Sequence, residues 1–165
     1  MLGALLTLSD HPKITLVVGT AHLQSVFFST QSSDTKCSQL TYSTNTLESL
    51  NADCLVFMCD CNLEGGSQLN NQNTCISRSG LTDGWKALRG TSDDYNDVSY
   101  RINDVTWNGA ENPKIGGIRE YHRPDRIFYK CNGNDIHLRL VNIERIVNNL
   151  SDHYGLIATF LMTKL

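Results

Sequence analysis

Residues 54–62 read CLVFMCDCN, a run of uncharged residues followed by an aspartate and an asparagine two positions apart. The run is short, apolar and bounded by polar residues, which predicts a buried β-strand over residues 54–62. Burial of an unpaired carboxylate costs several kcal/mol or neutralises the group. Asp60 and Asn62 therefore mark either an ordinary exit from strand to turn or a strand that presents both side chains at the rim of a site.

Further apolar runs of similar length lie on both sides of this strand. ALLTL and ITLVVGTAHL are joined by the turn-forming cluster SDHPK, which predicts a β-hairpin. Spacings of three or four residues predict an amphipathic helix through Cys37, Leu40, Thr44, Leu47 and Leu50. GLTDGWKALRG begins as a helix that Gly90 ends, and residues 64–79 form a loop, with or without a short helix. The remaining strand-like runs are DVTW, DRIFYK, IHLRLVNIERI and YGLIATFLM.

The composition is that of an ordinary folded domain. The chain has 165 residues, of which 40% are hydrophobic and 19% charged, enough for one domain with its own core. No repeat, low-complexity tract or long linker divides the chain, so we expect a single domain over residues 1–165. Strands with intervening helices and long polar loops predict the α/β (α+β) class, arranged as a layered sandwich.

The formal net charge of −3 does not favour a broad, nonspecific coat of nucleic acid. Five basic residues nevertheless cluster in one short region. They are either scattered over the surface, which is the interpretation we favour, or line a narrow basic groove. These residues are Lys114, Arg119, Arg123, Arg126 and Lys130.

The six cysteines include no Cys-x-x-Cys pair, which argues against a zinc site. Three lie in or beside apolar runs, where a free thiol behaves as a small hydrophobe. We therefore expect free thiols in a reducing, intracellular compartment. Residues 1–10 are apolar but lack a basic leader, and no run approaches the ~20 apolar residues of a membrane span. We expect no membrane partner.

Four short segments place acidic, amide or imidazole side chains at the ends of predicted strands. Each alone has a structural explanation, because Asp and Asn commonly bond their own backbone in turns and a lone histidine is usually hydrogen-bonded within the fold. Together they indicate a hydrolytic site, because a carboxylate beside a histidine is typical of such sites. Hard oxygen ligands suit Mg²⁺, which binds carboxylates together with water and phosphate, so the pattern points to phosphate chemistry. The candidate residues are His22, Asp60, Asn62, Asp125, Asp152 and His153.

The order of these motifs resembles that of the endonuclease/exonuclease/phosphatase superfamily. HLQS, a strand ending CDCN, then GLTDGW, TW, RPDRIF and SDHYGL follow one another over almost the whole chain. In that superfamily the strand ends Gly-Asp-x-Asn and the chain closes Ser-Asp-His. HLQS, CDCNL and SDHYGL are most similar to the 5′-tyrosyl-DNA phosphodiesterases, which remove topoisomerase tyrosine from 5′ DNA ends. The resemblance implies a layered β-sandwich flanked by helices.

The resemblance also implies catalytic roles. Asp60 would position and deprotonate the attacking water, and Asn62 would hold water and phosphate in line. Asp125 would orient His153. The histidine would bind a non-bridging phosphate oxygen and stabilise charge in the transition state.

Three further residues would contact substrate or metal. His22 would touch the scissile phosphate, and Trp107 would pack against the DNA near its 5′ end, although Trp107 is otherwise a core aromatic. Asp152 would reach the shell of Mg²⁺, for which Mn²⁺ is an alternative. Asp83 and Trp85 are expected to be structural. The implied partner is DNA with a 5′-phosphotyrosyl end. The protein would act as a monomer in the nucleus or cytoplasm.

The match is incomplete at the amino-terminal end. In the superfamily, the first half of the domain supplies an asparagine after the first strand and a metal-binding glutamate, whereas residues 1–21 contain neither residue type. We therefore expect a partial domain that lacks the amino-terminal part. The implied function is Mg²⁺-dependent hydrolysis of 5′-phosphotyrosyl DNA in DNA repair. The alternatives are an inactive fragment or another phosphodiesterase or nuclease of the superfamily.

Overall fold

The computed structural model describes residues 1–10, 13–24, 32–62, 69–90, 104–109, 121–133, 135–147 and 151–164. In chain order, its strands and helices are β1 (Leu2–Asp10), β2 (Lys13–His22), α1 (Ser32–Glu48), β3 (Cys54–Asp60), α2 (Leu69–Ser79), β4 (Thr82–Asp83), α3 (Gly84–Arg89), β5 (Trp107–Asn108), β6 (Tyr121–His122), β7 (Asp125–Cys131), β8 (Ile136–Ile146) and β9 (Gly155–Lys164).

Five of these strands form one sheet in the order β1-β2-β3-β7-β4. β2 and β3 are parallel, so their carboxyl ends reach the same edge, where His22 pairs with Asp60. β7 is antiparallel to β3 and therefore begins at that edge, where Asp125 pairs with Asp60. The place where β2 and β3 end and β7 begins is called the sheet rim below. It gathers polar residues from three distant parts of the chain.

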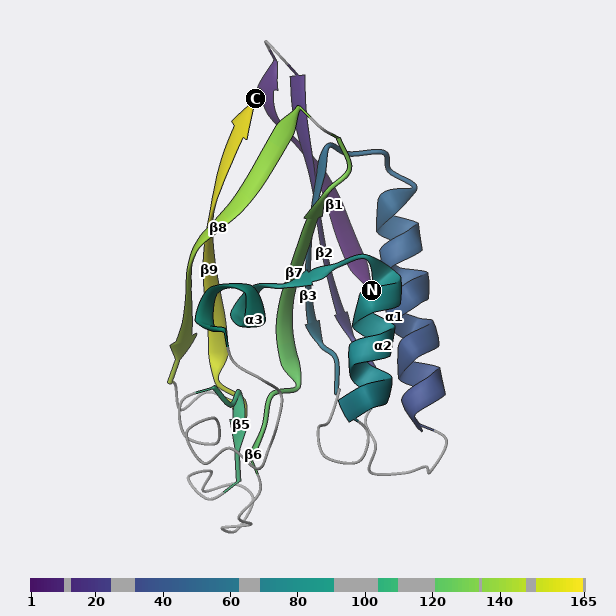
Figure 1. The fold of residues 1–165 in the computed structure, drawn as a ribbon, viewed down its shortest axis with the longest axis vertical. Helices are drawn as coiled ribbons and strands as arrows, with labels where there is room; N and C mark the ends of the chain where they lie inside the picture. The colour runs from purple at the N-terminus through teal and green to yellow at the C-terminus, as the bar shows by residue number, and fades with distance from the viewer. Residues whose placement is uncertain are drawn as a thin grey trace.

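Helices α1 and α2 lie on one face of the sheet and the β8–β9 hairpin on the other (Figure 1), and an apolar core lies on each face. On one face, Phe57 packs with residues of α1 and α2, among them the fully buried Leu40. On the other face, Val56 packs with Trp85 of α3 and with the inner side of the β8–β9 hairpin. Because neighbouring residues of a strand face opposite sides, one strand serves both cores. The expected layered α/β arrangement is confirmed.

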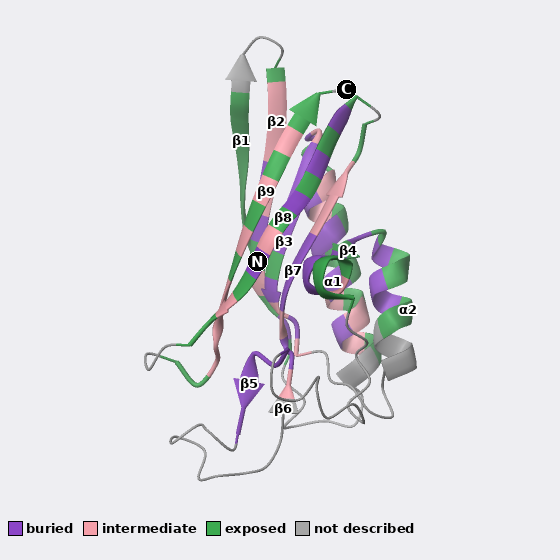
Figure 2. Ribbon diagram, turned by 60° about the vertical axis from the view of Figure 1, so that its left-hand side comes forward, coloured by how far each residue is buried: buried purple, intermediate pink, exposed green. Residues whose placement is uncertain are grey.

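The β8–β9 hairpin shows the alternation of a strand pair with one covered face (Figure 2). Burial alternates from Ile136 to Val141, and the pairing with β9 shifts in register between Leu140 and Asn142. By contrast, β1 forms the edge of the five-stranded sheet and is exposed along residues 1–8. The β1–β2 hairpin was expected from the turn-forming cluster between its strands and is confirmed as antiparallel, whereas the pairing of β8 with β9 was not predicted.

The predicted helix in GLTDGWKALRG is α3, and its ends follow capping rules. The Asp83 carboxylate accepts hydrogen bonds from the backbone N–H groups of Trp85 and Lys86. Gly90 closes the helix with φ 65°, in the left-handed region that glycine adopts without strain. The Asn-rich stretch before it contains more helix than its composition indicated, because α2 buries Cys75 and Ile76 against α1.

The expectation of free thiols is wrong in this structure, which pairs all six cysteines. Cys54 and Cys131 are partners on adjacent antiparallel strands with Cα atoms 4.2 Å apart. The other two pairs are Cys37–Cys75, between α1 and α2, and Cys59–Cys61, on either side of Asp60. The first two pairs join residues 77 and 38 positions apart. Local pattern carries no sign of partners at such separations.

The remaining strand predictions differ from the structure only in extent. DVTW contributes a two-residue strand, β5, whereas the runs beginning at Asp125, Ile136 and Tyr154 become the long strands β7, β8 and β9. Among the described residues, no helix is long and apolar enough to cross a membrane.

Candidate active site

Asp60 and His22 meet at the sheet rim. The side chain of Asp60 is 21% exposed, and its Oδ2 lies 3.3 Å from Nε2 of His22. Its Oδ1 accepts a hydrogen bond of 3.1 Å from the backbone N–H of Asn62. The parallel pairing of β2 with β3 brings the histidine to the carboxylate. With its side chain 70% exposed, His22 is open to a ligand arriving from solvent.

His153 and Asp125 form a close pair on the same side of the sheet as Asp60. Nδ1 of His153 lies 2.7 Å from Oδ2 of Asp125, a distance typical of a charge-assisted hydrogen bond. Register places Asp125 directly across from Asp60. The segment before β9 supplies the histidine, whose backbone N–H donates to Oγ of Ser151 at 3.1 Å. The carboxylates of β3 and β7 and the imidazole of the segment before β9 thus converge at the rim.

Thr106 links the two halves of that pair, although sequence reasoning did not single it out. Its Oγ1 accepts a hydrogen bond of 3.1 Å from the backbone N–H of Asp125. Its carbonyl accepts one of 2.7 Å from the N–H of Tyr154, next to His153. The TW motif contains this threonine, but a role was predicted only for its tryptophan.

Asn62 occupies a turn that several contacts fix. Its φ of 46° lies in the left-handed region, which asparagine tolerates better than most residues. The carboxamide Nδ2 donates to the carbonyl of Leu23 at 2.9 Å, beyond the end of β2. The ammonium of Lys36, on α1, donates to the Asn62 carbonyl at 2.5 Å. These contacts hold Asn62 at the rim beside Asp60.

The protonation of the site follows from these contacts. Burial raises the pKa of Asp60, and the negative charge of Asp125 raises it further. The hydrogen bond to Asp125 raises the pKa of His153 against the opposing effect of its burial. Asp60 thus holds its proton more strongly than an ordinary aspartate, and His153 stays charged to a higher pH than an ordinary histidine. Asp60 and His153 can therefore supply a base and a cation in the same site.

One group of described residues could hold a metal ion. Asp60, Asp125 and His153 each offer a ligand atom within 4.8 Å of the others. Carboxylate oxygens suit Mg²⁺, whereas Mn²⁺ also accepts imidazole nitrogen, so the donors fit the expected ions. Asp152, the predicted metal ligand, lies exposed beside His153 and outside this group.

Trp107 is the one predicted site residue whose side chain the structure buries, at 9% exposure. Its ring centroid lies 5.4 Å from that of His122, at an interplanar angle of 34°. It belongs to the two-stranded β5–β6 ribbon. This environment fits the alternative of a core aromatic and leaves little of the ring open to a nucleic-acid base.

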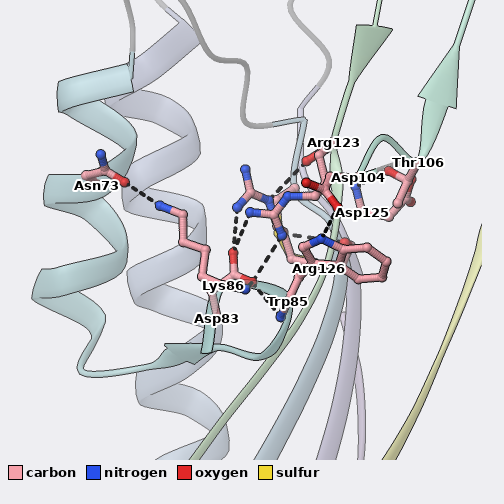
Figure 3. A network of polar contacts seen from close by, with 11 residues as sticks. Asn73, Asp83, Trp85, Lys86, Asp104, Thr106, Arg123, Asp125 and Arg126 are labelled. Atoms are coloured by element: carbon pink, nitrogen blue, oxygen red, sulfur yellow. Dashed lines mark hydrogen bonds and ion pairs between the residues drawn. A yellow bond between two sulfur atoms is a disulfide. The ribbon is translucent and has the colours of Figure 1, made fainter. Parts of the chain in front are cut away.

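Asp83 lies at the centre of a buried polar network on the helix side of the sheet (Figure 3). Arg123 donates two hydrogen bonds of 3.0 Å to its two carboxylate oxygens, and Arg126 donates one of 2.5 Å. All three side chains are essentially buried. Burial alone would raise the pKa of Asp83, but the two guanidinium charges hold it well below its ordinary value.

The interpretation of a scattered basic surface is therefore wrong for Arg123 and Arg126. Their partner is Asp83, some 40 positions away in the chain, which a count of local charges does not reveal. Lys130 is partly exposed and pairs with Glu48. Lys114 and Arg119 lie outside the described residues. The network also includes Asp104, whose Oδ1 accepts from the indole N–H of Trp85 at 3.0 Å.

Comparisons with known proteins identify solved structures that have a similar fold. No protein-family model matches the sequence, and no curated protein matches it either. A humanized D. rerio TDP2 with 14 mutations has a TM-score of 0.60 at 19% identity, over 92% of this chain and 57% of its own. D. rerio TDP2 complexed with single-strand DNA product has a TM-score of 0.63 at 17% identity, over 98% of this chain and 67% of its own.

A third solved structure is also similar in fold. An endonuclease/exonuclease/phosphatase family protein from Bacteroides thetaiotaomicron has a TM-score of 0.51 at 14% identity, over 93% of this chain and 50% of its own. At these identities the likeness is one of fold. The chain spans only 50–67% of the length of the three structures. It has the fold of the endonuclease/exonuclease/phosphatase structures, which confirms the architecture that the motifs predicted.

Proposed function

We propose that this chain is a metal-dependent phosphodiesterase that hydrolyses 5′-phosphotyrosyl DNA. The observation that carries the proposal is the convergence of Asp60 with the Asp125–His153 pair, whose ligand atoms all lie within 4.8 Å of one another. The fold likeness to D. rerio TDP2 in complex with single-strand DNA product supports a nucleic-acid substrate. The order of the HLQS, CDCN and SDHYGL motifs supports the tyrosyl leaving group.

In this mechanism Asp60 is the general base. Its ionised carboxylate takes a proton from a water whose oxygen attacks phosphorus, while the bond from phosphorus to the tyrosine oxygen breaks and the tyrosine leaves with the electron pair. Asn62 orients water and phosphate, since its contacts to Leu23 and to Lys36 hold the turn. The DNA retains a 5′-phosphate.

His153 acts as the cation of the site. Asp125 orients its ring and keeps it protonated, so that it donates a hydrogen bond to a non-bridging phosphate oxygen as negative charge builds up. His22 contacts the phosphate from the β2 side. Asp152 would hold Mg²⁺, which would neutralise phosphate charge when bound.

A direct test is Mg²⁺-dependent release of tyrosine from a 5′-phosphotyrosyl oligonucleotide. Asp60→Asn removes the base without changing side-chain size, and Asp135→Asn makes the same change at an exposed residue of a turn. We expect turnover by the unchanged chain and by Asp135→Asn, loss in Asp60→Asn, and loss on chelation of the metal. Equal turnover by both variants would exclude Asp60 as the base.

A second candidate is a chain that binds DNA without turnover. It is favoured by one observation, that the predicted metal ligand Asp152 lies exposed and outside the group formed by Asp60, Asp125 and His153. Fluorescence anisotropy with the same oligonucleotide separates the two candidates. Binding by folded protein with no tyrosine released in Mg²⁺ or Mn²⁺ would favour the second.

A further inference from the structure

Lys36 is the most unusual residue of the α1 surface that faces the sheet. Buried positions of α1 follow a stripe that includes Leu40, Thr44 and Leu47, and Lys36 occupies the same stripe with only 1% of its surface exposed. Lysine is almost never fully buried unless its charge has a partner. The helix therefore places a cation where an apolar side chain would pack more easily, and the contacts of its ammonium should explain why.

The ammonium group is directed at the rim turn. Nζ donates a hydrogen bond of 2.5 Å to the backbone carbonyl of Asn62. A hydrogen bond from a charged donor is about twice as strong as a neutral one. Asn62 has left β3, so the ladder of the sheet no longer fixes its carbonyl, and its positive φ adds a local cost that surrounding contacts must offset.

The three contacts of Asn62 act on different parts of one residue. Its carbonyl accepts from Lys36, its carboxamide donates to Leu23, and its backbone N–H donates to the Asp60 carboxylate. A neighbouring bond from the Cys61 N–H to the Pro124 carbonyl, 2.8 Å long, ties the same turn to the start of β7. Loss of the carbonyl contact would free the peptide to rotate, and both site side chains would move with it.

We infer that Lys36 is a positioning residue for the phosphate site, holding the carboxamide of Asn62 and the carboxylate of Asp60 in their working orientation from the far side of the turn. The inference rests on the proposed function for its kinetic consequence but not for its structural one. Since Lys36 touches neither water nor phosphate in this role, its removal should lower kcat more than it changes KM.

The kinetic test compares three variants of the full chain. Lys36→Met keeps the length and removes the charge, Lys36→Arg restores a donor, and Lys86→Met makes the same change at a lysine whose ammonium bonds an exposed asparagine, Asn73. We expect kcat for the phosphotyrosyl oligonucleotide to fall ~10–100-fold in Lys36→Met, with KM nearly unchanged. Lys36→Arg should recover much of the loss, and Lys86→Met should match the unchanged chain.

Nuclear magnetic resonance gives a readout that needs no turnover. The side-chain amide signals of Asn62 should shift and broaden in Lys36→Met and stay in place in Lys86→Met. In the unchanged protein, the ammonium protons of Lys36 should exchange with water far more slowly than those of Lys86. Exchange as fast at Lys36 as at Lys86 would overturn the inference even if Lys36→Met does not fold.

The two proposals fail separately. If the unchanged chain has no turnover but the Asn62 signals respond to Lys36→Met, the proposed function is wrong and Lys36 still positions the turn. If turnover is normal and the Asn62 signals and kcat are the same in folded Lys36→Met, Lys36 has no positioning role.

Discussion

Two clusters of charge lie back to back on β7 and differ in how their charges balance. Asp125 faces the sheet rim with Asp60 and His153, whereas the next residue, Arg126, faces the helix side and joins Asp83 and Arg123. In the buried network, two guanidiniums surround the carboxylate of Asp83, and the carboxyl group of Asp104 accepts a hydrogen bond from Trp85. At the rim, the carboxylates of Asp60 and Asp125 lie beside the imidazoles of His22 and His153, and the pKa of Asp60 is raised by burial and by the charge of Asp125.

The difference separates stability from chemistry. The buried network holds Asp83 permanently ionised, so it serves as a fixed anchor between α3, β4 and β7. At the rim, burial and the charge of Asp125 raise the pKa of Asp60, which makes its carboxylate a stronger base than an ordinary aspartate. Replacement by asparagine should therefore reduce mainly the stability of the protein at Asp83 and mainly its activity at Asp60.

The largest effect is expected from Asp83→Asn. Removal of the carboxylate leaves two buried guanidiniums without their counter-charge, and breaking a buried pair in this way costs ~3–5 kcal/mol. Denaturant unfolding should show that loss, and the control Asp34→Asn, at an exposed residue of α1, should change the free energy by less than ~0.5 kcal/mol. A loss below ~1 kcal/mol at Asp83 would mean that the network contributes little.

Asp60→Asn should reverse the pattern. The free energy of unfolding should stay equal or rise, because a carboxylate that is costly to ionise is replaced by a neutral group of the same shape. Turnover should fall ~10²–10⁴-fold with the loss of the general base. Thermal unfolding and single-turnover kinetics on one preparation measure both. A large fall in stability together with activity would place Asp60 among the structural aspartates.

Asp125→Asn tests the coupling within the rim by its pH dependence. The raised pKa of His153 means that its charged form is complete below about 6.5 and is lost only as the pH rises through the higher folded-state value. The asparagine variant should lower that pKa, so activity and the associated stabilisation should decline at a lower pH. Titration of the His153 ring by nuclear magnetic resonance gives the shift directly, with exposed His137 as an internal reference. An unmoved His153 titration would contradict the coupling.

Trp85→Phe should give the smallest effect. It removes the indole N–H that donates to Asp104 at 3.0 Å and leaves a buried carboxyl whose pKa burial already raises. We expect a loss of about 1–2 kcal/mol in denaturant unfolding. Trp107→Phe, at an indole that contacts the His122 ring instead, gives the packing contribution to subtract. Equal losses in the two variants would show that the Asp104 hydrogen bond adds nothing measurable.

Sequence reasoning succeeded where one segment carries its own signal. The strand that ends at Asp60, the long strands β7, β8 and β9 and the end of α3 at Gly90 all follow from periodicity and local chemistry. It failed where two distant segments define the outcome. The partners of Arg123 and of Cys54 lie 40 and 77 positions away, and a polar stretch became α2 because its few apolar residues had α1 to pack on.

The site shows the same division. Asp60 and Asn62 were found because they follow an apolar run, and His153 because it stands in a motif that resembles a known one. The contacts of Lys36 with Asn62 and of Thr106 with Asp125 were not predicted, since each crosses the fold with no local pattern to mark it. Residues that support a site are harder to read from sequence than residues that form it.

The strict alternation along β7 also limits how the gene can change in length. Deletion of one codon, for instance that of Ile127, would turn Asp125 toward the helices and Arg126 toward the rim, exchanging the members of both clusters at once. Removal of two adjacent codons would keep each side chain on its own face. We therefore expect viable variants of β7 to differ in length by two residues and not by one. β1, exposed at the edge of the sheet, carries no such constraint.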